Sequence, residues 1–174
     1  IARDAVPALE LAFDLAASAD LIVTIGGASV GDHDLVGQVA LAKGMERSFY
    51  KVAMRPGKPL MAGKINGTPM MGLPGNPVSA MVCGHIFMLP ILRKMLGRGQ
   101  AAATRRSATL THALGVNGPR EHYMRARLST DGLHVFERQD SALLTVLAEA
   151  NCLAIRPPHD SARLPGELLE IIPI

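Results

Sequence analysis

The spacing of apolar residues changes along the chain, and the change divides it into two regions. From residue 1 to about 98, apolar residues at helical spacing alternate with short continuous apolar runs, which is typical of helices packed on a buried sheet. From about 104 to 174, apolar and polar positions mostly alternate, and Gly, Pro and Asp separate the runs. We therefore predict an α/β domain over 1–98 and a small all-β domain over 104–174.

The first region begins with a predicted helix, because Leu9, Phe13 and Ala16 recur at helical spacing after Pro7. The run LIVTI that follows predicts a buried strand of a parallel sheet, leading into a glycine-rich turn. A wound sheet rarely begins with a crossover helix, so we expect a strand that precedes this helix to be missing. The further elements predicted are a helix in DLVGQVALAKG, strands in YKVAM, LMAGKI and GTPMMGL, and an apolar helix over 78–96.

The second region predicts short strands and one helix. A polar linker, GRGQAAATRR, precedes it. The predicted strands lie in SATLTHAL, HYMRARLST, LHVFER, NCLAIRP and ELLEIIPI, and the predicted helix lies in SALLTVLAEA.

Composition narrows the class of protein. The 174 residues are 48% hydrophobic and 19% charged, enough for a buried core, while aromatic residues are 3% and the net charge of +3 is dispersed. We therefore expect no nucleic-acid partner. No leader pattern opens the chain, and Gly84, His85 and Pro90 interrupt its longest apolar stretch, so we expect no membrane span and a cytoplasmic location. The two cysteines, Cys83 and Cys152, lie in apolar segments and are expected to be buried thiols.

The segment GGASVGDHD, residues 26–34, follows a predicted strand and precedes a predicted helix. Its glycines allow backbone N–H groups to face an anion, and the helix adds its positive end. Asp32 and Asp34 would repel a phosphate unless a cation such as Mg²⁺ lay between them. Two readings remain open here: a phosphate and metal loop, or a plain turn with one aspartate capping the helix.

Two further loops contain proline beside polar residues. In RPGKP, residues 55–59, prolines stiffen a turn that carries Arg55 and Lys58, which suits a compact oxyanion. In GLPGNPVSA, residues 72–80, Pro77 fits the first position of a helix and Asn76 its N-cap. Such a helix start is either an anion site or a well-capped core helix.

The three loops, in this order and spacing, resemble the molybdopterin molybdenumtransferase family, which includes MoeA and the E domain of gephyrin. The resemblance continues through PREHYMRAR (119–127), QDSALL (139–144) and AEAN (148–151) and covers essentially the whole chain. It implies a three-layer molybdopterin-binding α/β domain, incomplete at its N-terminal end, followed by a small all-β domain.

The resemblance also implies an activity: a transferase that inserts molybdate into adenylylated molybdopterin with Mg²⁺ and releases AMP. Asp34 and Lys58 would act in catalysis, and Asp34 and Asp4 would hold metal or nucleotide. The residues implied in pterin or phosphate binding are Gly26, Gly27, Ser29, Gly31, Pro74, Gly75, Asn76 and Pro77. The residues implied in molybdate binding are Arg55, Lys58, Ser79, Arg120 or Arg125, and Ser141.

Family members are roughly twice this long or more, so we expect a C-terminal fragment with impaired turnover from a protein that is a homodimer at full length. Arg55 stands where a lysine is usual in the family. Two alternative functions are a molybdopterin adenylyltransferase-like binder, which would end without the β domain, and a gephyrin-like scaffold for receptor peptides.

Overall fold

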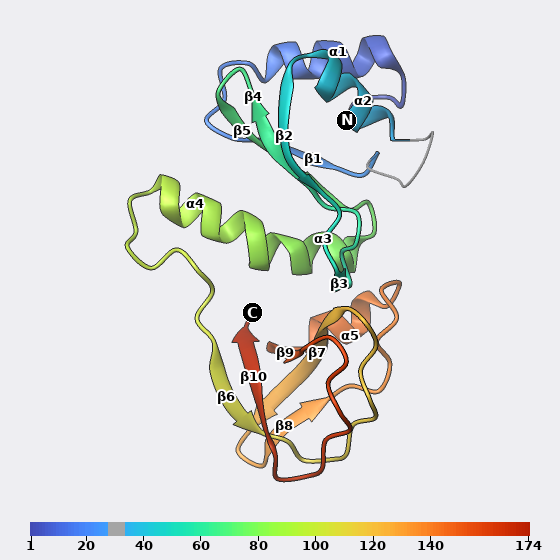
Figure 1. The fold of residues 1–174 in the computed structure, drawn as a ribbon, viewed down its shortest axis with the longest axis vertical. Coiled ribbons are helices and arrows are strands. Elements are labelled where there is room, and N and C mark those ends of the chain that lie inside the picture. The colour runs from blue at the N-terminus through green and yellow to red at the C-terminus, as the bar shows by residue number, and fades with distance from the viewer. Residues whose placement is uncertain (28–33) are drawn as a thin grey trace. The chain divides into compact units, whose positions relative to one another are not determined.

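The computed structural model describes residues 1–27 and 34–174, which form two compact units (Figure 1). Unit 1 comprises Ile1–Val52 and Gly57–Cys83, and unit 2 comprises Ala53–Pro56 and Gly84–Ile174. The division falls inside the apolar helical run, so the predicted domain boundary near residue 98 stays a prediction.

Unit 1 is built on a four-stranded mixed sheet, in the order β1-β5-β4-β2. Its strands are β1 (Ile22–Ile25), β5 (Thr68–Leu73), β4 (Met61–Ile65) and β2 (Met45–Tyr50). Among these strands only β1 and β5 pair in parallel, so the expectation of a parallel sheet is wrong for the described part of unit 1. The cause is local: Asn66 and Gly67 both have positive φ and close a tight β4–β5 hairpin, which makes neighbouring strands antiparallel.

Helices α1 (Val6–Leu15) and α2 (Leu35–Ala42) pack on one face of this sheet (Figure 1). Leu9 and Phe13 of α1 and Val36 and Val39 of α2 lie in one buried cluster with Ile22 of β1. The same cluster includes Ala40, Met45, Met61, Ile65 and Met70. The predicted α/β class of the first region is therefore confirmed.

Strand β2 was not predicted from the sequence, and the strand predicted in YKVAM is mostly loop. In β2 only Met45 is buried, and the next residues are exposed, so the alternation that signals a half-buried strand is absent. Of YKVAM, only Tyr50 and Met54 belong to strands, the latter to the two-residue β3 (Met54–Arg55).

The predicted apolar helix forms, but it is not regular throughout. Its segments are α3 (Pro77–Cys83), the π-helical turn η1 (Gly84–Met88) and α4 (Leu89–Met95). Pro90 has no N–H to donate to the preceding turn, and a wider turn accommodates that loss. Within the described residues this run is long and apolar enough to cross a membrane by composition alone. Core helices of soluble proteins satisfy the same criterion, so the run assigns no membrane.

Unit 2 includes η1 and α4, and from residue 106 onward it is an all-β domain with one short helix, as predicted. Its sheet has the order β3-β7-β9-β10-β6, and β8 pairs with β7. The strands after β3 are β6 (Arg106–Thr109), β7 (Glu121–Ser129), β8 (Gly132–Val135), β9 (Cys152–Arg156) and β10 (Leu168–Pro173), and the helix is α5 (Leu144–Glu149). A bridge between Leu110 and Leu133 joins the segment after β6 to β8 around a buried core.

Both cysteines are buried and unpaired, as predicted. Burial raises the pKa of the Cys83 thiol to about 12 and that of Cys152 to about 11. Neither thiol is therefore a nucleophile at neutral pH.

Candidate functional site

Two of the predicted loops meet in unit 1, where the parallel strands β1 and β5 end. The Gly26 N–H donates to the Leu73 carbonyl at 3.1 Å. A Cβ atom built on Gly75 would lie only 3.2 Å from the Gly26 Cα, so the two backbones are in close contact. The carboxyl ends of parallel strands are where open α/β sheets commonly bind ligands, which makes this edge the candidate pterin and phosphate side.

A cavity of about 370 Å³ lies along β1 and reaches its carboxyl end, lined by Asp4, Thr24, Gly26 and Gly27 and by apolar side chains of α1 and β1. Three residues with predicted roles, Asp4, Gly26 and Gly27, therefore share one cavity. Gly27 has φ of +68°, and a Cβ there would lie 2.3 Å from Val36 Cγ2. Ser29, Gly31 and Asp32 lie outside the described residues.

Asp34 is the N-cap of α2. Its Oδ1 accepts a hydrogen bond from the Gly37 N–H at 2.9 Å. A Cβ on residue 37 would lie 2.4 Å from the Asp34 carboxylate, so glycine is needed for this approach. Asp34 is buried, and it also accepts from Tyr50, whose pKa is raised first by burial and then by this carboxylate. The capping alternative is thus confirmed for Asp34, and its metal role stays a prediction.

The corner before α3 has the cap geometry predicted from its sequence. Asn76 Oδ1 accepts from the Ser79 N–H at 3.1 Å and from the Ser79 hydroxyl at 3.3 Å, and Pro77 begins the helix. Ser79 is buried and its amide and hydroxyl already have a partner in Asn76. An anion at this helix start would compete with the cap for Ser79.

The RPGKP turn holds two exposed cations on a buried frame. Pro56 and Gly57 are buried, whereas Arg55 and Lys58 are exposed. The Lys58 carbonyl accepts from the N–H groups of Val52 and Leu60, both at 3.2 Å. Arg55 belongs to unit 2 through β3, and Lys58 belongs to unit 1.

Arg125, in β7, is the most unusual predicted site residue in unit 2. It is fully buried, and only its Nη2 has a partner, the Asp140 carbonyl at 3.1 Å. Its Nε and Nη1 are buried without a hydrogen-bond partner in the described part of the chain. A buried guanidinium with donors left over is costly unless something else accepts from them. An anion is the natural acceptor.

His122, three residues earlier in β7, was not given a role in the sequence analysis. Its backbone pairs with Arg55 of β3 on one side and Arg156 of β9 on the other. Burial, followed by the charges of Arg55, Arg125, Arg156 and Arg120, lowers its pKa to about 4. His122 is therefore neutral at pH 7, and the charges of four arginines act on it.

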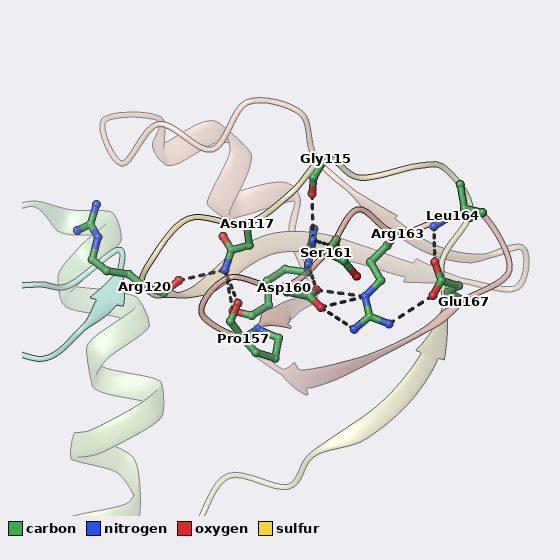
Figure 2. A network of polar contacts seen from close by, with 10 residues as sticks. Gly115, Asn117, Arg120, Pro157, Asp160, Ser161, Arg163, Leu164 and Glu167 are labelled. Atoms are coloured by element: carbon green, nitrogen blue, oxygen red, sulfur yellow. Dashed lines mark hydrogen bonds and ion pairs between the residues drawn. The ribbon is translucent and has the colours of Figure 1, made fainter.

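Arg120 and Ser141, two further predicted site residues, also lie in unit 2. The amide of Asn117 donates to the Arg120 carbonyl at 3.0 Å and to the carbonyls of Arg156 and Pro157 (Figure 2). The Arg120 side chain points away from this network (Figure 2). Ser141 is partly buried in the turn after Asp140. Asn117 carried no signal in the sequence, because its partners are up to 40 residues away.

A buried ion-pair network supports the end of β9. Asp160 accepts from the Arg156 Nε and from Arg163, whose Nη2 lies at 2.6 Å, and Arg163 also contacts Glu167 (Figure 2). The Arg156 Nη2 donates to the carbonyls of Gly115 and Ser161. Arg156 therefore has partners at both Nε and Nη2 and is ion-paired with Asp160, unlike Arg125.

Comparisons with known proteins agree with the two regions. Residues 1–94 match a family described as "Probable molybdopterin binding domain", and residues 107–174 match "MoeA C-terminal region (domain IV)". A molybdopterin molybdenumtransferase of a Nostoc species is 35% identical over 150 residues, which are 81% of this chain and 34% of that protein. One from Staphylococcus aureus is 30% identical over 157 residues, 88% of this chain and 38% of that protein.

Solved structures show the same likeness. The MoeA protein of Pyrococcus horikoshii superposes with a TM-score of 0.79 at 26% identity, covering 99% of this chain and 42% of that one. The chain spans about a third of the length of the curated relatives it matches. With both domain matches and these relatives together, the chain belongs to the molybdopterin molybdenumtransferase (MoeA) family.

Proposed function

We propose that this chain binds molybdate for its insertion into adenylylated molybdopterin, with release of AMP, in molybdenum cofactor biosynthesis. The relatives are molybdopterin molybdenumtransferases by name, which supports this activity. The chain's match to the MoeA C-terminal region favours it over the adenylyltransferase-like alternative, which was expected to end without that region.

The observation that carries the proposal is the buried Arg125 with two unpartnered donor atoms. Molybdate is a tetrahedral dianion, and charge-assisted hydrogen bonds from a guanidinium hold such oxyanions in a fixed orientation. Arg55, Arg120 and Ser141 would add cations and a hydroxyl in unit 2. Lys58 and Ser79, in unit 1, stay predicted molybdate residues.

The residues of this chain would bind and orient; none is needed as a nucleophile, because a molybdate oxygen can attack the phosphorus of the adenylate. Gly26 and Gly27, with Pro74, Gly75, Asn76 and Pro77, would hold the pterin or its phosphate at the edge of β1 and β5. Because His122 is neutral at pH 7, the positive charge near an anion in this part of unit 2 comes from the arginines.

We also propose that the protein uses Mg²⁺, that it is a homodimer at full length and that it is located in the cytoplasm. Asp34 and Asp4 are the carboxylates proposed for the metal. The described residues gather no group of three or more metal-binding side chains, and the Asp34 carboxylate already serves Gly37 and Tyr50. These residues do not by themselves form a fitting Mg²⁺ site.

The test is calorimetric titration of the 174-residue chain with molybdate, comparing Arg125→Gln with Arg127→Gln. Arg127 lies on the same strand but is exposed and serves as the matched control. Losing hydrogen bonds from a charged donor should weaken binding by at least about tenfold in Arg125→Gln, whereas Arg127→Gln should bind as the unchanged chain does. Arg125→Lys, which keeps the charge but loses the planar fork, should fall between them. Equal affinities for the two Gln variants would contradict the proposal.

A further inference from the structure

Gln139 is tied to the backbone of Arg125 by its side chain. The Arg125 N–H donates to Gln139 Oε1 at 2.9 Å, and Gln139 Nε2 donates to the Arg125 carbonyl at 2.9 Å. Gln139 Nε2 also donates to the Phe136 carbonyl at 2.6 Å. The primary amide thus bonds both polar groups of one residue in β7, as a neighbouring strand would.

The Gln139 amide bonds to β7 at the residue just beyond the last β7–β8 pair. The β7–β8 register runs from Ser129 and Gly132 to Ala126 and Val135, so Arg125 is the next residue of β7 beyond the last pair. On its other side Arg125 pairs with Leu153 of β9. The Arg125 carbonyl also accepts from the Phe136 N–H at 3.1 Å, and the Gln139 amide adds a second donor to it and an acceptor for the Arg125 N–H. The side chain of this same residue has Nε and Nη1 buried without a hydrogen-bond partner among the described residues.

The same segment also touches the Arg125 side chain. The carbonyl of Asp140, the residue after Gln139, accepts from Arg125 Nη2 at 3.1 Å. The Asp140 carboxylate accepts from the Ala142 N–H at 2.9 Å, which shapes the turn that carries Ser141. Gln139 thereby fixes the turn containing Asp140 and Ser141 against the strand residue that carries the guanidinium.

We propose that Gln139 is a positioning residue of the oxyanion site: its amide sets the orientation of Arg125 relative to Ser141 and leaves Nε and Nη1 free for the anion. This inference rests on the proposed function of the same site. Gln139 itself need not touch the anion, because both of its amide atoms are used on backbone groups.

Unit 2 provides a matched control. Asn151 makes the same reciprocal pair of bonds with Leu128, three residues further along β7, at 2.8 Å from the Leu128 N–H and 2.9 Å to its carbonyl. Leu128 is partly exposed and has no proposed role. A merely structural contribution should appear alike in Gln139→Ala and Asn151→Ala.

The experiment measures three quantities on the 174-residue chain and both variants: the dissociation constant for molybdate, the urea midpoint, and the NMR signal of the Arg125 side-chain Nε–H. We expect Gln139→Ala to raise the dissociation constant about five- to tenfold, the effect of about one lost hydrogen bond on the ordering of Arg125. It should also broaden the Nε–H signal. Asn151→Ala should change neither, although both variants lower the urea midpoint.

Equal molybdate affinity and an equal Nε–H signal in the two variants would overturn the inference. If the unchanged chain binds no molybdate, the proposed function fails. The Nε–H signal then decides the positioning claim alone: loss confined to Gln139→Ala supports it, and an unchanged signal refutes it. Gln139→Met, which keeps the side-chain length without hydrogen bonds, replaces Gln139→Ala if the latter does not fold.

Discussion

Removing the Asp160 carboxylate should be the most destabilising single change in the ion-pair network of unit 2. Asp160 accepts from Arg156 Nε and from Arg163 Nε and Nη2, and the side chains of Asp160 and Arg156 are only 6% and 3% exposed. In Asp160→Ala the Arg156 charge stays buried, and of its bonds only those from Nη2 to Gly115 and Ser161 remain. Breaking a buried ion pair in this way costs about 3–5 kcal/mol.

The control is Glu170→Ala, which removes a pair in the same unit. Arg105 and Glu170 are 46% and 55% exposed, so their ion pair contributes less than about 1 kcal/mol. Urea unfolding followed by NMR signals of β7 and β9 reports on unit 2 alone. A loss for Asp160→Ala no larger than that for Glu170→Ala would refute the reasoning.

The pH dependence of this stability difference tests the same prediction independently. Hydrogen bonding to Arg163, with a further contribution from Arg156, lowers the pKa of Asp160 below its ordinary value of 3.8. A carboxylate with a depressed pKa stabilises the fold at neutral pH, and that contribution is lost as the pH falls below the ordinary value. The difference between the unchanged chain and Asp160→Ala should therefore shrink in acid.

Three further predictions concern the site. The pKa of His122 is lowered to about 4, so its ring should show no NMR titration between pH 8 and 6. Because the folded chain keeps this ring neutral, stability should fall as the pH drops below 6.5, the ordinary pKa of histidine. A midpoint near 6.5 would contradict this. In the full-length protein, Lys58→Ala should raise the molybdate concentration needed for half-maximal turnover; an unchanged requirement removes Lys58 from the site. Asp34→Asn should keep the α2 cap, because an amide oxygen can also accept from the Gly37 N–H, so the urea midpoint should change little; a midpoint as low as that of Asp34→Ala would contradict the capping role.

Elements with a clear apolar period were predictable from the sequence, and elements held by distant partners were not. The alternation in HYMRARLST predicted β7, the short apolar run in NCLAIRP predicted β9, and Asn76 with Pro77 predicted the start of α3. Strand β2 was missed because its residues after Met45 are exposed, so that it lacks an alternating pattern.

The candidate site shows the same division. The resemblance to a family identified Arg125, yet its burial and free donors became visible only when β7 was placed between β8 and β9. Gln139 and Asp160 form hydrogen bonds that depend on folded turns rather than on any local motif. Asp34 carried two readings in the sequence, and the Gly37 contact confirmed the capping one.

The most direct test of the central claim is to locate the anion. Tungstate, a heavier tetrahedral oxyanion of the same charge as molybdate, can be diffused into crystals of the chain and located by its anomalous scattering. We predict a tungsten peak whose oxygens lie within about 3.2 Å of Arg125 Nε or Nη1. Tungstate bound elsewhere, with those two donors still unpartnered, would contradict the account.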